Sequence, residues 1–365
     1  MPVSITSEIQ KRSEVNFGNP YRLLKLMEKA RRGEKITYIS LGGSVTHGCF
    51  AESPQTCYAA LIASWLKKNF PQCEVVFENA GIGATGSLIG VHRLKKDVLC
   101  FNPDFVVVEY SVNEDNSETV KEAYDNLIFN ILNHGSSPAV LLLSMMIKGG
   151  GNAQFVHSKV GFHYNVPMIS FRDAFWPEVE KGNLAFEELY GDDVIHPNNT
   201  GHRVAAELVT AYLEKLLKLS LNDYSDDKYE KHLVSDQYKN ANIYYPDDIK
   251  PVSYGCFRIA EMQGLEKMKK GWRADTNGEP MIFSFKKATR IFVLFEKTNR
   301  GDGGKAEIEV DGKCVSFDAD FTDGWGIYSN CEQIFESKKP SDVTITVKPK
   351  LEKNKEFSIV GILVS

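Results

Sequence analysis

Apolar runs of strand length alternate with segments of helical periodicity across the first 218 residues. Five runs have the length and composition of strands: 36–41, 74–80, 104–110, 139–144 and 166–170. Four segments between and around them have helical patterns: 19–34, 58–70, 118–132 and 201–217. Strands that alternate with helices form a parallel sheet covered on both faces. We therefore predict an α/β fold, a three-layer α/β/α domain over residues 1–220.

The pattern changes after residue 218. Residues 221–251 are polar and rich in tyrosine, which is typical of a linker that runs over a surface. From residue 252 onward, short alternating runs separated by turns predict strands with no helix among them. Asp311-Gly312 lies between two such runs and indicates a hairpin. We therefore predict an antiparallel β-sandwich domain over residues 252–365.

Charge and cysteine content exclude several classes of function. The 365 residues have a formal net charge of −5 and no basic block, so nucleic acid is not an expected partner. No apolar run approaches the ~18 residues of a membrane span, and the N-terminal residues show no signal-peptide pattern. The seven cysteines are scattered without a C-x-x-C pair, which favours free thiols over disulfides or a zinc site. We therefore expect a cytoplasmic protein that contacts no membrane.

A lone serine follows the first predicted strand, where residues 39–48 read ISLGGSVTHG. Ligands of open parallel sheets bind beyond the carboxyl ends of the strands, so Ser44 would face that crevice. The alternative is a serine that caps a turn or a helix. The dinucleotide fingerprint G-x-G-x-x-G is absent, and Thr46 breaks the G-x-S-x-G pattern of a nucleophile elbow.

A nucleophilic serine needs a base, and the base needs a carboxylate that orients it. Asp193 and His196 lie three residues apart in YGDDVIHPNNTGH (190–202), just before the last predicted helix. In a turn, this spacing lets the carboxylate reach the ring nitrogen that faces away from the serine. The alternative is a helix-entry loop in which both side chains are merely solvated.

Acyl transfer also requires donors for the oxyanion of the tetrahedral intermediate. NAGIGATGS (79–87) follows the second predicted strand, and SVNED (111–115) follows the third. The glycine loop could present a backbone N–H, and Asn113 could present its side-chain amide. Glycine-rich loops and Asn turns are common, so each segment alone is weak evidence.

The four segments together resemble the SGNH hydrolases, also called the GDSL family. Their blocks are GGSVTHG, NAGIGATGS, EYSVNED and DDVIHPN, and the resemblance spans roughly residues 34–217. It implies that Ser44 is the nucleophile and that Asp193 and His196 form the last block. It implies Gly83 and Asn113 as oxyanion donors, with Gly81 and Gly86 competing for the role of Gly83.

The sequence departs from the family pattern beside these residues. Gly43 stands in place of the usual Asp before the serine. Ser111 and Glu114 replace the Gly and Asp around the asparagine. The changes fall on neighbours of the groups that would do the chemistry, so the assignment stands.

The resemblance implies ester hydrolysis through an acyl-enzyme, with no metal or other cofactor. His196 would take the proton of Ser44, and Asp193 would hold the imidazole. The N–H groups of Ser44 and Gly83 and the amide of Asn113 would form the oxyanion hole. The small, polar neighbours at 46–58 favour a short acyl group such as acetyl over a fatty chain.

The second domain suggests that the alcohol part of the ester substrate is a sugar. A β-sandwich beside an SGNH domain resembles the carbohydrate-binding modules of carbohydrate esterases, and the arrangement is similar to intracellular acetyl-mannan esterases. Trp325, in the loop FTDGWGIYSN (321–330), could stack on a sugar ring or belong to the core. We expect an acetylated oligosaccharide as substrate and expect the sandwich to contribute to the active site. A homo-oligomer stays open.

Three alternatives remain at this point. The first is an acetylesterase for other sugars, such as xylo-oligosaccharides or O-acetyl sialic acid. The second is a thioesterase or lysophospholipase, which a mostly apolar channel at Ser44 would favour. The third is a decayed hydrolase that only binds carbohydrate, against which the intact Ser, Asp and His argue.

Overall fold

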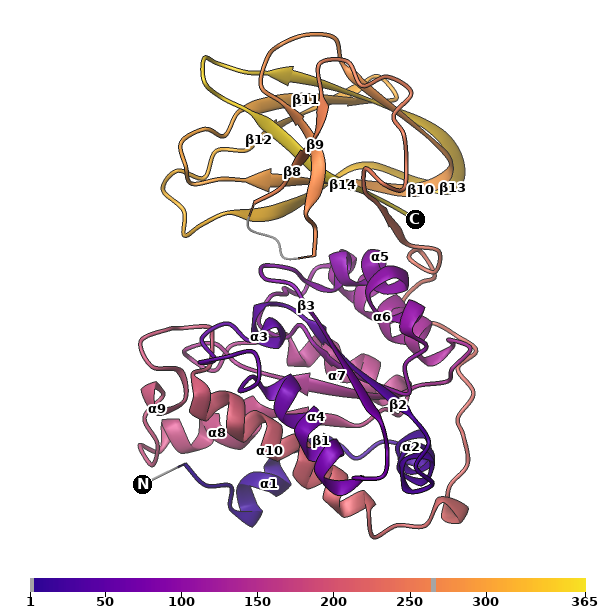
Figure 1. Ribbon diagram of the computed structural model, residues 1–365, viewed down its shortest axis with the longest axis vertical. Helices are drawn as coiled ribbons and strands as arrows, with labels where there is room; N and C mark the ends of the chain where they lie inside the picture. The colour runs from indigo at the N-terminus through magenta and orange to yellow at the C-terminus, as the bar shows by residue number, and fades with distance from the viewer. Residues whose placement is uncertain (1–2, 264–266) are drawn as a thin grey trace. The chain divides into compact units, whose positions relative to one another are not determined.

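The computed structural model describes residues 3–263 and 267–365, and the chain divides into two compact units (Figure 1). The first unit comprises residues 1–236 and the second residues 237–365. Each unit has a hydrophobic core of its own. Within the described ranges, none of the helices combines the length and the apolar character that a bilayer crossing requires.

A six-stranded sheet with the order β1-β6-β5-β4-β2-β3 forms the centre of the first unit. Its strands are β1 (Glu14–Asn16), β2 (Ile36–Gly42), β3 (Val75–Gly81), β4 (Phe105–Glu109), β5 (Ala139–Ser144) and β6 (Met168–Ser170). Strands β2 to β6 are parallel, which confirms the predicted sheet. The short edge strand β1, antiparallel to β6, was not predicted because its three residues carry no apolar run.

The order in which successive strands join this sheet reverses at β2. From β2 the chain passes first to β3 on one side and then to β4 on the other. Such a reversal leaves a crevice beyond the carboxyl ends of the two neighbouring strands, here β2 and β4. The segments that follow β2 and β4 therefore meet at one place, and these segments carry Ser44 and Asn113.

Helices cover both faces of the sheet (Figure 1). The helical segments are α1 (Ser7–Ser13), α2 (Tyr21–Arg31), α3 (Ser44–His47), α4 (Tyr58–Asn69), α5 (Ser87–Asp97), η1 (Leu99–Phe101), α6 (Glu118–Leu132), α7 (Gln154–His163), α8 (Phe171–Glu180), α9 (Glu187–Tyr190), α10 (Asn199–Leu216) and η2 (Leu221–Asp223). Apolar residues of α2, α4, α8 and α10 share one core with the sheet. Helices α5, α6 and α7 pack on one another in sequence order and form the other layer. The predicted three-layer α/β/α domain is confirmed.

The second unit is an antiparallel β domain with the strand order β12-β11-β13-β10-β14-β9-β8, and β7 pairs with β14. Its strands are β7 (Asn242–Tyr244), β8 (Arg258–Glu261), β9 (Lys270–Ala274), β10 (Met281–Lys297), β11 (Lys305–Val310), β12 (Lys313–Asp318), β13 (Tyr328–Lys350) and β14 (Phe357–Val364). β11 and β12 form the hairpin that Asp311-Gly312 predicted, with Asp311 and Gly312 both at positive φ.

Two long strands supply both layers of this domain. In one layer, the first part of β10 pairs with the last part of β13, which pairs with β11, and β11 pairs with β12. In the other layer, the last part of β10 pairs with β14. Register shifts around Ala288 separate the two parts of β10, as β-bulges do where a sheet bends. Rings from the two layers meet in the core. Phe295, in the last part of β10, contacts Phe317 of β12, and Phe283, in the first part of β10, contacts Trp272 of β9. These contacts give the predicted sandwich.

The segment expected as a linker, residues 221–251, is divided between the two units. Its first part is fastened to the first unit, where Asp125 accepts hydrogen bonds from the backbone N–H groups of Leu233 and Val234. Its second part contains β7, which pairs with β14 in the second unit. Polar composition predicted a surface segment, but the backbone hydrogen bonds that fasten it could not be deduced from composition.

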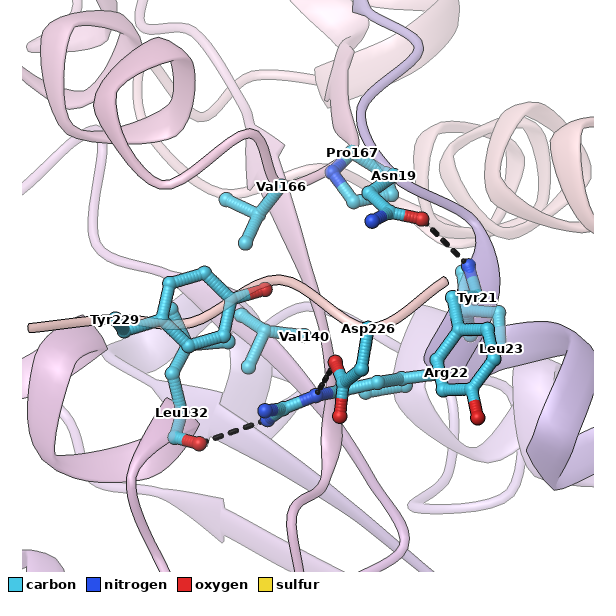
Figure 2. Close-up of a pocket in the computed structure, with 11 residues that line it drawn as sticks. Asn19, Tyr21, Arg22, Leu23, Leu132, Val140, Val166, Pro167, Asp226 and Tyr229 are labelled. Carbon is cyan, nitrogen blue, oxygen red and sulfur yellow. Dashed lines mark hydrogen bonds and ion pairs between the residues drawn. The ribbon is translucent and has the colours of Figure 1, made fainter. Parts of the chain in front are cut away.

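Arg22 provides a further attachment for this segment, as Figure 2 shows. Its guanidinium pairs with Asp226 at 2.8 Å and donates to the carbonyl of Leu132 at 2.7 Å. A small pocket lies here, lined in part by Ala139 and Pro167 at the amino ends of β5 and β6. It is therefore at the opposite edge of the sheet from Ser44.

Candidate active site

Ser44 begins α3 directly after β2, and its side chain is almost completely buried. The turn from strand to helix is too tight for a side chain at Gly42. A Cβ there would lie 2.0 Å from Thr46 Oγ1 and 2.2 Å from the carbonyl oxygen of Glu109. A Cβ on Gly43 would lie 2.4 Å from Asn113 Oδ1. The two glycines therefore let the segment that carries Ser44 approach β4 and the residues after it.

His196 contacts Ser44, although 152 residues separate them in sequence. Its Nε2 lies 2.9 Å from Ser44 Oγ, which is hydrogen-bond distance. On the other side of the ring, Nδ1 lies 3.2 Å from Asp193 Oδ1. This second contact is close but not aligned as a hydrogen bond, because Nδ1 has no hydrogen-bond partner among the described residues. A small rotation of the imidazole would align it, as happens when catalytic contacts tighten around substrate.

Asp193 organises the turn that presents His196. Its Oδ1 accepts the backbone N–H groups of Ile195 and His196, both at 2.6 Å. Burial acts to raise the pKa of Asp193, but these two N–H groups and the imidazole outweigh it, so the net pKa is below its ordinary value. Asp193 is therefore ionised and can stabilise a positive charge on His196.

One of the three candidate glycines lies beside Ser44. A Cβ on Gly83 would be 4.0 Å from Ser44 Cβ. A Cβ on Gly81 would instead be 2.2 Å from the backbone nitrogen of His47, and one on Gly86 would face Glu114 at 3.2 Å. Gly83 is thus the glycine of this loop whose position suits an oxyanion donor to Ser44.

The structure places the side-chain carbonyl of Asn113 against Gly43, next to Ser44. Ser44, Gly83, Asn113 and the Asp193–His196 turn therefore come together at the carboxyl edge of the sheet from four separate segments. Trp325 belongs to the second unit, where it is exposed and contacts the rings of Phe321 and Tyr328. It is thus not a core residue of that unit.

A buried arginine that the sequence analysis did not identify supports this edge. Arg93 of α5 is fully buried, and its guanidinium donates to the carbonyls of Gly42 at 3.1 Å and Ala80 at 2.7 Å. It also donates to the hydroxyl of Tyr110 at 3.0 Å and pairs with Asp97 at 2.8 Å. These bonds tie the ends of β2, β3 and β4 together just before the site residues.

A second buried group joins the two segments that carry the predicted oxyanion donors, Gly83 and Asn113. Glu114 follows Asn113, and its carboxylate accepts the backbone N–H of Ser87 and contacts His157 Nε2, each at 2.5 Å. The side chains of Glu114 and His157 are each 1% exposed. Tyr124 stacks on His157 with ring centroids 3.7 Å apart. The glycine loop that ends at Ser87 is thereby held to the segment that carries Asn113.

Neither the buried Arg93 nor the contact between Glu114 and His157 could be predicted from the local sequence pattern. Arg93 lies in HRLKKD, which has the composition of an exposed helix end, and His157 is 43 residues from Glu114. The one available signal was Glu114 itself, as a departure beside Asn113. Within the described ranges, no group of three or more His, Cys, Asp or Glu side chains is arranged to hold a metal ion.

Comparison with known proteins gives the family. The model of the GDSL-like lipase/acylhydrolase family matches residues 40–204. A crystal structure of a two-domain esterase active on acetylated mannans is 32% identical, with a TM-score of 0.92 over 98% of each chain. A second structure of such an esterase, co-crystallised with mannopentaose, is 32% identical, with a TM-score of 0.90 over 100% of this chain and 99% of that one.

No curated protein matches the chain. The structural match nevertheless extends over both units at more than 30% identity, and the family match covers all four segments of the site. The predicted resemblance is confirmed: the chain belongs to the GDSL-like lipase/acylhydrolase family of hydrolases.

Proposed function

We propose that the protein is a serine esterase that removes O-acetyl groups from acetylated manno-oligosaccharides. The observation that carries this proposal is the 2.9 Å contact between Ser44 Oγ and His196 Nε2, with ionised Asp193 beside the same imidazole. This arrangement is the one that nucleophilic acyl transfer requires. It occurs where the family match lies.

The reaction proceeds in two steps. In the first, Ser44 Oγ bonds to the acetyl carbonyl carbon while His196 takes the hydroxyl proton. The bond from that carbon to the sugar oxygen then breaks, and His196 Nε2 returns the proton to the leaving oxygen. In the second step, His196 takes a proton from water as the water oxygen bonds to the acetyl carbon. The bond from this carbon to Ser44 Oγ then breaks, His196 returns the proton to Ser44 Oγ, and acetate leaves.

The oxyanion that forms in each step is stabilised by hydrogen bonds. The donors are the backbone N–H groups of Ser44 and Gly83 and the side-chain amide of Asn113. Their value depends on being fixed before substrate arrives, because donors that need no reorganisation stabilise the transition state most. The buried bonds of Arg93 and Glu114 supply this rigidity.

Acetylated manno-oligosaccharide is the substrate class with the most support. The similar structures over nearly the whole chain are of esterases active on acetylated mannans, one of them with mannopentaose. Exposed Trp325, braced by Phe321 and Tyr328, offers an aromatic surface of the kind that sugars stack on. The cysteines are thiols rather than disulfides, which supports action in a reducing compartment such as the cytoplasm.

The decisive experiment measures acetate release from acetylated manno- and xylo-oligosaccharides by wild type and Ser44→Ala. A long-chain p-nitrophenyl ester is assayed alongside. We expect release from the manno-oligosaccharides that Ser44→Ala abolishes. A preference for xylo-oligosaccharides would change the sugar. Turnover of only the long-chain ester would favour a lysophospholipase or thioesterase. Sugar binding with no serine-dependent release would favour a carbohydrate-binding protein.

A further inference from the structure

Both the exposure and the backbone conformation of Phe50 are unfavourable for the stability of the fold. Its side chain is 61% exposed, so it leaves a large apolar surface in water. Its φ is +64°, a left-handed backbone conformation that bulky side chains rarely adopt. Residues held in such conformations cluster at functional sites, because the surrounding structure must enforce them.

The loop that carries Phe50 is held on both sides of it. The imidazole of His202 donates through Nε2 to the carbonyl of Cys49 at 3.2 Å, and Asn199 Oδ1 accepts the backbone N–H of Glu52 at 2.9 Å. His202 Nδ1 accepts the N–H of Tyr58 at 3.3 Å, which fixes the tautomer with hydrogen on Nε2. Both anchors belong to α10, and the turn that precedes α10 carries His196.

The ring of Phe50 lies parallel to the imidazole of His196. The ring centroids are 5.6 Å apart and the planes differ by 3°. The imidazole side that contacts Ser44 is the side where the leaving oxygen receives its proton. The sugar that carries this oxygen must therefore lie against the imidazole, and Phe50 is the exposed flat ring beside it. The acetyl group, in contrast, points toward Gly83 and Asn113.

We propose that Phe50 is a specificity-determining residue, an aromatic wall that packs against the pyranose ring carrying the scissile acetate. This proposal rests on the proposed function and adds the residue that selects the alcohol. An apolar ring excludes water from the face of the sugar and fixes its orientation with little entropy loss. Phe50 therefore accelerates acylation by sugar esters and has no role in acylation by esters without a sugar.

The test compares two substrates with one acyl group. Acetate release is measured from acetylated manno-oligosaccharide and from ethyl acetate, with wild type, Phe50→Ala, Phe50→Leu and Phe50→Trp. We expect Phe50→Ala to lower kcat/KM about tenfold or more on the sugar and less than twofold on ethyl acetate. Phe50→Leu keeps apolar bulk without a flat face and should resemble Phe50→Ala, whereas Phe50→Trp should retain the sugar activity.

Phe162→Ala is the matched control, since Phe162 is a similarly exposed phenylalanine (58%) on α7. It should change neither activity. Ethyl acetate turnover also shows that each variant is folded. Equal losses on both substrates would overturn the proposal, because Phe50 would then act only by positioning His196. Unchanged sugar activity in Phe50→Ala would overturn it as well.

The proposed function has a separate readout in the same experiment. Wild type without serine-dependent release from the sugar would overturn both proposals. Wild type with such release, matched by Phe50→Ala, would overturn only the role of Phe50.

Discussion

The two sides of Ser44 are held by different means. On the oxyanion side, Arg93, Glu114 and His157 are buried to 1% exposure or less and bond the strand ends and loops together. On the base side, the side chains of His196 and Asp193 are 22% and 20% exposed, and Phe50 is more exposed still. In the mechanism proposed above, this difference gives the acyl group a rigid cradle and the alcohol an adaptable side.

The largest effect is expected on the base side. In the proposed mechanism His196 accepts the Ser44 proton, so in His196→Ala the kcat for acetate release should fall by about 10⁴-fold or more. The unfolding midpoint in urea should stay close to that of wild type, because the side chains of His196 and Asp193 are both partly exposed. Substantial activity in this variant would show that another base acts on Ser44.

Next in size is the loss of an oxyanion donor. Asn113→Ala should lower kcat by about 10²- to 10³-fold and leave KM nearly unchanged, since the proposed role of the amide is to stabilise charge that develops only in the transition state. Steady-state kinetics on acetylated manno-oligosaccharide and ethyl acetate measure it. The loss should be the same for both esters, in contrast to Phe50→Ala. A loss confined to the sugar ester would place Asn113 on the alcohol side instead.

The rigidity of the oxyanion side predicts a stability effect. Glu114→Ala leaves His157 and the Ser87 N–H without their buried partner, so the free energy of unfolding should fall by about 3 kcal/mol. Urea titration measures this change. The control is Glu74→Ala, which breaks the exposed pair with Lys35 and should cost less than about 0.5 kcal/mol. Similar values for the two variants would remove the contrast between the two sides.

The smallest effect concerns the anchor of the Phe50 loop. Burial lowers the pKa of His202 to about 4, and likewise that of His92. Between pH 6.5 and 4 the unfolded chain binds protons at these residues that the folded chain does not, so stability falls as pH falls through this window. His202→Gln should reduce that slope by up to about 1.4 kcal/mol per pH unit. Urea titrations at pH 7, 5.5 and 4.5 measure it, and an unchanged slope would contradict the burial of a neutral His202.

Much of the fold could be predicted because its signals are local. The apolar runs at 36–41 and 139–144 lie within β2 and β5, and the turn residues before α10 pointed to Asp193 and His196. Helix α5 was missed because Gly90 interrupts its pattern. That glycine is required by packing, since a Cβ would lie 2.6 Å from the hydroxyl of Tyr110. Such a requirement arises from a partner 20 residues away.

The supports of the site escaped prediction for the same physical reason. Arg93 and His157 have ordinary neighbours in sequence, and their burial follows from groups that the fold brings to them. Phe50 lies in the segment 46–58, whose small, polar residues suggested a substrate with a short acyl group. Its backbone conformation and its contact with His196 exist only in three dimensions.

The pairing of β7 with β14 has a consequence for how such proteins arise. β7 is the first strand of the second unit and β14 the last, and Ile243 and Leu363 are partners across them. The unit is therefore entered and left at neighbouring points. A module whose entry and exit lie side by side can be inserted into another chain, or removed from it, without rearranging its own sheet. The same hydrolase framework could in this way acquire a different second domain.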